Sequence, residues 1–99
     1  GGASVEEQAR EYAERGKPDF ALAYLLESAL PDGEKREVLA HAYERRAALT
    51  EQRAREFDRQ FHRPFPLLFA EARKDRGAAR QVRTGGAIRP GVSRQLPMS

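Results

Sequence analysis

The sequence predicts an all-α protein, a small helical bundle made of a helical hairpin, one long helix and a short C-terminal helix, with a disordered basic tail. Three observations support this fold class. Apolar residues recur at intervals of three and four along much of the chain, which is the period of an amphipathic helix. Glycines and prolines stand between these segments, where helices end. The residues from position 77 onward have no such period.

The first predicted helix starts at Ser4, whose hydroxyl can cap the first free amides, with Glu7 completing a capping box. Gly16 ends the helix in a left-handed conformation, and Pro18 cannot continue it. The apolar residues of this segment share one face: Val5, Ala9, Tyr12 and Ala13.

The second predicted helix has Asp19 as its cap and Pro31 as its stop. Its apolar residues leave almost no polar face: Phe20, Leu22, Tyr24, Leu25, Leu26 and Leu30. A helix that is apolar nearly all round belongs between other elements. We therefore expect this helix at the centre of the fold.

The third predicted helix runs about 28 residues, from Glu34 to about Phe61, and ends before Pro64. A heptad seam follows it, small in the middle and aromatic at the end: Ala40, Tyr43, Ala47, Thr50, Ala54, Phe57 and Phe61. A helix of this length is about 42 Å long, whereas the first two helices span about 18 Å each. They can cover only one half of it.

The far half needs another cover. Past Pro64 and Pro66 a short helix is expected, closed by Gly77, which can fold back onto the long helix. The three bulky residues of this short helix are too few to cover the far half of the long helix completely. The apolar patch that stays exposed is typical of a partner-binding site. The expected partner-binding residues are Phe57, Phe61, Phe65, Leu67, Leu68 and Phe69.

Residues 5–30 resemble one tetratricopeptide unit, a helix-turn-helix repeat of about 34 residues. The positions that carry the resemblance are Val5, Ala9, Tyr12, Gly16, Ala21, Leu25 and Ser28. The resemblance implies a hairpin in which small residues sit where the two helices cross. One repeat later Leu39 fits the pattern, whereas Tyr43 and Arg46 depart from it. A single unit is too little for the family's peptide-binding groove.

Charge divides the chain unevenly. Residues 1–72 hold 11 Lys/Arg and 14 Asp/Glu, whereas residues 73–99 hold seven Lys/Arg and one acid, Asp75. We therefore divide the chain into residues 1–3, a flexible start or an expression remnant, a helical domain over 4–76 and a disordered Arg-rich tail over 77–99. Such a tail suits an anionic ligand or partner. Its expected contacts are Arg73, Arg76, Arg80, Arg83, Arg89 and Arg94.

Sequence patterns that would indicate catalysis or metal binding are weak. Glu34, Glu37, His41 and Glu44 are spaced 3, 4 and 3 apart, as in helix-bundle metal sites. No other segment offers a matching set, so this stripe is interpreted as a solvated face. The chain has no cysteine and no phosphate-binding loop. We expect no enzyme, no catalytic residues, no metal and no cofactor.

These observations favour a non-catalytic protein–protein interaction or adaptor module that uses the end of the long helix, residues 64–76 and the basic tail. The alternative is a nucleic-acid-binding protein whose tail arginines contact phosphates. Self-association is a third alternative. We expect no membrane contact, since the helices mix both charge signs, and a cytoplasmic location, since no signal peptide or membrane span is evident.

Overall fold

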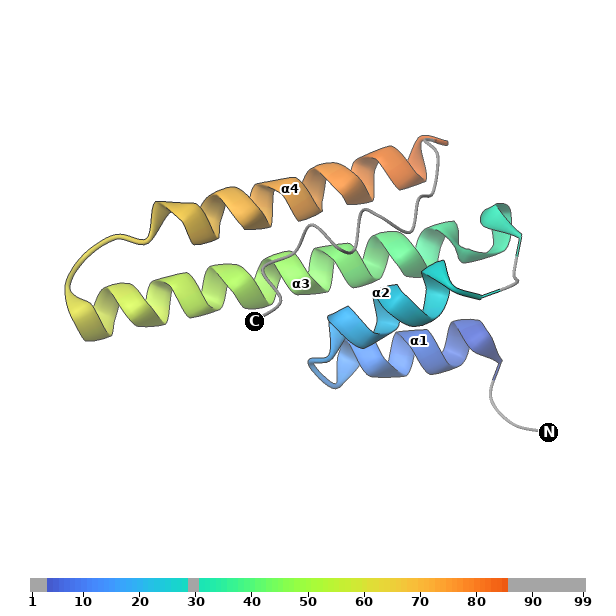
Figure 1. The fold of residues 1–99 in the computed structure, drawn as a ribbon, viewed down its shortest axis with the longest axis horizontal. Coiled ribbons are helices and arrows are strands. Elements are labelled where there is room, and N and C mark those ends of the chain that lie inside the picture. The colour runs from blue at the N-terminus through green and yellow to red at the C-terminus, as the bar shows by residue number, and fades with distance from the viewer. Residues whose placement is uncertain (1–3, 29–30, 86–99) are drawn as a thin grey trace.

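The structure, a computed structural model, describes residues 4–28 and 31–85, and these form four helices. They are α1 (Val5–Glu14), α2 (Pro18–Leu26), α3 (Asp32–Phe61) and α4 (Pro66–Arg83) (Figure 1). The predicted all-α helical bundle, with a short hairpin and one long helix, is confirmed. The flexible start over residues 1–3 and the last part of the predicted tail, with Arg89 and Arg94, lie outside the described residues.

The two ends of α1 are where the sequence predicts them. The Glu7 backbone N–H donates to Ser4 Oγ at 3.1 Å. Gly16 adopts a left-handed φ of 81°. The Lys17 N–H donates to the Tyr12 carbonyl at 2.9 Å and the Gly16 N–H to the Ala13 carbonyl at 3.2 Å. These two bonds form a Schellman motif, which satisfies carbonyls that the helix end leaves free.

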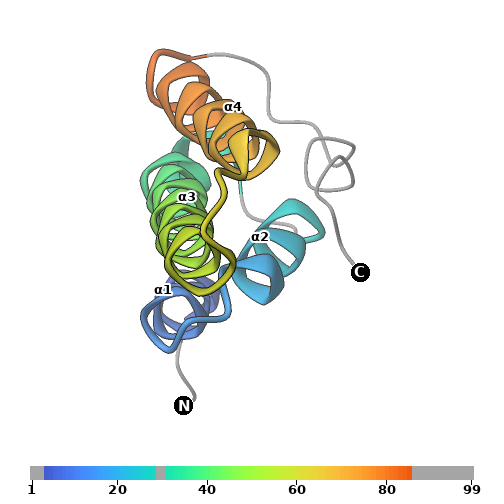
Figure 2. The same ribbon diagram turned by 90° about the vertical axis from the view of Figure 1, so that its left-hand side faces the viewer.

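The central helix is α3, not α2 as predicted. Helix α3 packs against each of the other three helices, and Figure 2 shows α4 and α1 on opposite sides of it, with α2 beside α1. Helix α2 buries only one face: Ala21, Leu22, Leu25 and Leu26. Its aromatic residues Phe20 and Tyr24 are 62% and 41% exposed, and each instead packs a ring against Tyr12 at 6.1 Å between centroids.

The predicted Asp19 cap is also wrong. Helix α2 begins at Pro18, a residue that suits the first turn because its missing N–H would have no partner there. Lys17 occupies the cap position without a side-chain bond. The Asp19 carboxylate instead accepts a hydrogen bond from Arg46 of α3.

The core lies at one end of α3. Helices α1 and α2 lie beside the first half of α3, whereas the second half runs alongside α4 only (Figure 1). We call these halves the proximal and the distal end of the molecule. The largest fully buried side chains all belong to the proximal core: Tyr43, Leu22, Leu25, Leu39 and Val38.

Helices α3 and α4 run antiparallel and approach each other through small residues (Figure 1). Ala47, Ala54 and Ala72 are fully buried although they have little side chain to bury. Alanines at a helix crossing let the two backbones come close, which excludes water without bulky residues. Most of the predicted seam of α3 is therefore an intramolecular contact, but the seam becomes progressively exposed at its aromatic end.

Helix α4 continues through Gly77 to Arg83, so the predicted helix stop at Gly77 is wrong, and residues 77–83, predicted to be part of the tail, are helical. The reason is tertiary packing. A helical glycine costs about 1 kcal/mol relative to alanine, whereas the turns after Gly77 bury Ala79 and Val82 against the proximal core. Burial of apolar side chains outweighs the cost. The helix ends at Thr84 and Gly85, which has a φ of 94°.

We expect Gly77→Ala to stabilise the protein by about 0.5–1 kcal/mol, because alanine is the better helix former and an added Cβ meets only the end of the Arg80 side chain, at 3.8 Å. The matched control is Gly16→Ala, which we expect to destabilise because of the positive φ there. Urea unfolding measures both. A loss of stability in Gly77→Ala would show that this glycine ends the helix.

Candidate functional site

Three phenylalanines gather where α3 turns into α4. Ring centroids are 5.9 Å apart for Phe57 and Phe61, 5.3 Å for Phe57 and Phe65, and 6.1 Å for Phe61 and Phe65. The turn that brings them together begins at His62, which adopts a left-handed φ of 54° and donates its N–H to the Asp58 carbonyl at 2.7 Å. Phe61 ends one helix and Phe65 precedes the next, so a tight turn is enough to place them side by side.

This cluster does not close into a core. Phe57 and Phe65 are half-buried, whereas Phe61 is 52% exposed. In the first turn of α4, Leu67 is 80% exposed, and Leu68 and Phe69 are half-buried. We call these six residues the distal patch: Phe57, Phe61, Phe65, Leu67, Leu68 and Phe69.

The distal patch wraps around the end of the hairpin instead of forming one flat face. Leu67 and Phe69 are two residues apart on a helix, which separates them by about 200° around its axis. All six residues predicted to bind a partner thus lie at one end of the molecule, and the three phenylalanines are in direct ring contact.

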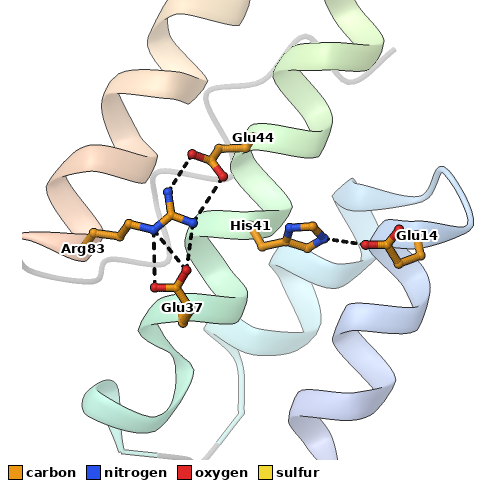
Figure 3. A network of polar contacts seen from close by, with 5 residues as sticks. All are labelled: Glu14, Glu37, His41, Glu44 and Arg83. Carbon is orange, nitrogen blue, oxygen red and sulfur yellow. Dashed lines mark hydrogen bonds and ion pairs between the residues drawn. The ribbon is translucent and has the colours of Figure 1, made fainter.

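The arginines predicted as tail contacts have different surroundings. Arg76 binds Glu51 through Nη2 at 2.6 Å and Nε at 3.2 Å. Arg83 binds Glu44 at 2.6 Å and Glu37 at 2.8 Å (Figure 3). Both arginines therefore fasten α4 to α3. Arg73 and Arg80 are exposed residues of α4.

In the stripe Glu34, Glu37, His41 and Glu44, the last three residues connect α3 to other helices. Glu37 and Glu44 hold Arg83 from α4, and on the other side His41 Nε2 lies 2.7 Å from Glu14 Oε1 of α1 (Figure 3). The interpretation as a solvated face missed these contacts. Among residues 4–28 and 31–85 no group of three or more acidic or histidine side chains is placed to hold a metal ion.

The glutamate–arginine contacts form a ladder with a seven-residue repeat. Glu37, Glu44 and Glu51 are seven apart on α3, and Arg76 and Arg83 are seven apart on α4. Seven residues bring a helix back to nearly the same side, so the ladder follows one edge of the α3–α4 contact. The arginine hydrogen bonds lower the pKa of each of the three glutamates below its usual value.

These shifts set a pH dependence. A carboxylate whose pKa is lowered by folding adds stability above its unfolded pKa, and that stability is lost as the pH falls through the folded pKa. We expect stability to fall between about pH 5 and pH 3, and to fall less in Glu37→Gln/Glu44→Gln. Thermal unfolding across this range measures the slope. Glu34→Gln removes a neighbouring exposed carboxylate and serves as the control; if the double variant kept the full wild-type slope, the ladder would not cause it.

A buried ion pair, absent from the sequence-based predictions, connects three helices. Arg46 binds Asp75 of α4 through two parallel bonds, Nε to Oδ2 and Nη2 to Oδ1, both at 2.8 Å. Its Nη1 donates to Asp19 of α2 at 2.9 Å. Arg46 and Asp75 are only 6% and 4% exposed.

Burial shifts the pKa of two groups at this ion pair. Burial raises the pKa of the Asp75 carboxyl, against the opposing effect of the Arg46 guanidinium. As the pH falls, protonation of Asp75 therefore adds to the stability of the fold, whereas protonation of the ladder glutamates reduces it. Burial likewise raises the pKa of Tyr43 to about 12. The Arg46 guanidinium lies 5.4 Å from the centre of that ring, so the charge rests on an aromatic face as well as on carboxylates.

A signal for this pair exists in the sequence. Leu68, Ala72, Asp75, Ala79 and Val82 are spaced 4, 3, 4 and 3 apart, a heptad seam on α4. Asp75 is the charged residue within that seam, and a charge at such a position requires a partner of opposite sign.

Comparison with known proteins gives no relative. No protein-family model, no curated protein and no solved structure matches the chain. The resemblance of residues 5–30 to a tetratricopeptide unit therefore stays a prediction. Within the described residues, no helix has the length and apolar character needed to cross a membrane.

Proposed function

We propose that this chain is a non-catalytic protein–protein interaction or adaptor module, and that the distal patch is its partner-binding surface. The observation that carries the proposal is the exposure of Phe61 and Leu67 beside phenylalanine rings that contact one another edge-on at the end of the α3–α4 hairpin. Exposed apolar groups that cluster, with aromatic residues among them, are typical of protein-binding surfaces.

The patch lies outside the hydrophobic core. The proximal core is built from α1, α2, the first half of α3 and the last turns of α4, and none of the six patch residues belongs to it. The alanine contacts and the glutamate–arginine ladder fix α4 against α3 between the two ends. The patch is thus presented on a preorganised support, which reduces the entropy lost on binding.

The basic tail has to be separated from the helical part of the chain at the end of α4 and not at Gly77. Arg76 and Arg83 are held by glutamates, so the predicted contacts left for a partner are Arg73 and Arg80, which are exposed on α4, and Arg89 and Arg94. A cut at Gly77 would remove Ala79 and Val82 from the core. Truncation after Gly85 is the variant that tests the tail while keeping all four helices.

We expect Phe61→Ser to abolish recovery of the partner when the tagged chain is purified from its native cell extract, because the substitution removes an exposed ring of the patch. The matched control is Phe20→Ser. Phe20 is equally an exposed phenylalanine, but it lies on α2. Both substitutions should change the free energy of unfolding by less than about 1 kcal/mol. Loss of the partner with Phe20→Ser and its retention with Phe61→Ser would assign binding to the other end.

Nucleic-acid binding is the weaker candidate. It requires arginines that are open to phosphates, and two of the six tail arginines instead form short bonds to glutamates. The rings of the distal patch also pack against one another at tilted and edge-on angles, so their faces are partly occupied and less open to stacked bases.

A further inference from the structure

The distal end of the molecule carries a net positive charge. Residues 52–74, which contain the distal patch, hold six Lys/Arg and three Asp/Glu, a net charge of +3. Residues 1–51 hold seven Lys/Arg and eleven Asp/Glu, and residues 75–99 hold five Lys/Arg and one acid. The end that carries the exposed apolar residues is therefore basic, in contrast to the acidic first half of the chain.

The distal arginines form no ion pair, in contrast to the three arginines that connect α3 to α2 and α4. Arg46, Arg76 and Arg83 are all bound by acidic residues. The distal ones are exposed and form no ion pair within the part of the chain that the structure describes: Arg53, Arg55, Arg59, Arg63 and Arg73. The acidic residues nearby are few, and Glu71 already lies 3.6 Å from Lys74.

Several of these arginines border the patch itself. Arg53 precedes Phe57 by four residues on α3, and Arg73 follows Phe69 by four residues on α4, which places each pair on one face of its helix. The Arg63 guanidinium lies 5.7 Å from the centre of the Phe65 ring. Apolar contacts and positive charge thus alternate over the same surface.

Resting on the proposed function, we infer that the partner segment on the distal patch is an acidic amphipathic peptide, in which apolar anchors alternate with Asp and Glu. The anchors would cover Phe61 and Leu67, and the carboxylates would pair with the bordering arginines. Complementary charge of this kind selects partners and speeds their encounter. A second copy of the chain fits poorly at this site, because two distal ends of the same positive charge repel each other.

A peptide fits the surface better than other anions do. Leu67, the most exposed large apolar side chain among the described residues, is aliphatic and offers no face for a base to stack on. The patch also wraps around the end of a hairpin, and the arginines lie on several sides of it. An anionic bilayer presents one flat plane and would reach only some of them.

The test is selection of a random peptide library, displayed on phage, on the immobilised full chain. The same library is selected in parallel on the Leu67→Glu variant, and only peptides specific to the unmodified chain are kept. We expect these peptides to carry more Asp and Glu than Lys and Arg. A synthetic copy of the most enriched peptide should bind about tenfold more weakly to Arg53→Ser/Arg63→Ser. Each exposed ion pair between an arginine and a carboxylate of the peptide contributes modestly to the affinity, and this variant removes two of them. Arg10→Ser/Arg80→Ser, which removes two exposed arginines away from the patch, should leave its affinity unchanged.

The possible results separate the two proposals. Specific peptides that are neutral or basic would overturn the acidic partner and leave the patch as a binding surface. Equal enrichment on the unmodified chain and on Leu67→Glu would overturn the patch itself. Displacement of the peptide by phosphatidylserine vesicles or by a single-stranded RNA oligonucleotide, with vesicle or RNA binding abolished by Leu67→Glu, would instead assign the site to a membrane or to nucleic acid.

Discussion

Replacing Asp75 with alanine should lower the free energy of unfolding by about 3–5 kcal/mol, because the change leaves the buried Arg46 guanidinium without its two-bond partner. Asp19 makes only one bond to Arg46 and is partly exposed to water, so it cannot replace Asp75. For a chain of this size such a loss is a large share of the total stability. Chemical unfolding followed by circular dichroism measures it.

The double variant Arg46→Leu/Asp75→Leu separates the cost of a lone charge from the value of the pair. Replacing a buried ion pair with apolar residues is often neutral or stabilising. We therefore expect the double variant to recover most of the stability that the single variant loses. If Asp75→Ala alone changed stability by less than about 1 kcal/mol, Arg46 would not depend on Asp75 in the way described.

Tyr43→Ala should have a comparable effect, about 3–5 kcal/mol, since it empties the largest fully buried side chain of the proximal core. Tyr43→Phe is the matched control, because it keeps the ring and removes only the hydroxyl. We expect the control to lose much less stability. Thermal and chemical unfolding of both variants should agree, and a small effect of Tyr43→Ala would place the core elsewhere.

Tyr43 and Arg46, the partner of Asp75, lie where the helices of the molecule meet. They are one helical turn apart on α3, where α1, α2 and α4 all contact the long helix. Beyond them α3 meets α4 only, through alanines and the outer ladder. The hydrophobic core of the chain is thus concentrated at one end, and the aromatic residues at the other end lie outside it.

Local signals in the sequence predicted the helices well. Ser4 and Gly16 act through bonds to residues within five positions, so their effect can be recognised without knowing the fold. The small-residue seam of α3 likewise follows from its spacing, since a heptad stripe must face another helix. The aromatic end of this seam correctly indicated an apolar surface that the short helices do not cover.

Interactions between distant residues were harder to foresee. Glycine is a common helix stop, and the burial of Ala79 and Val82 against other helices explains why α4 continues past Gly77. Helix α2 is apolar on most sides, yet what lies beside it depends on the packing of α1 and α3. The pairing of Arg46 with Asp75 depends on the antiparallel register of α3 and α4, which spacing within one helix does not determine.

The same limit applied to the charges. A count along the sequence assigned the arginines of α4 to a free basic tail, whereas the ladder neutralises Arg76 and Arg83 within the fold. Several exposed arginines that form no ion pair in the described residues lie at the distal end, beside Phe61 and Leu67. We therefore expect electrostatic attraction at the patch as well as at the tail.

The central claim is that the distal patch is open in the free chain and covered by a partner. Hydroxyl-radical footprinting of the purified chain, alone and in its native cell extract, tests it directly, because the radicals oxidise exposed aromatic and leucine side chains. We predict that Phe61 and Leu67 are oxidised in the free chain and protected in the extract, while Phe20 and Tyr24 are oxidised equally in both. Protection of Phe20 and Tyr24 instead, or a distal patch already protected in the purified chain, would contradict the claim.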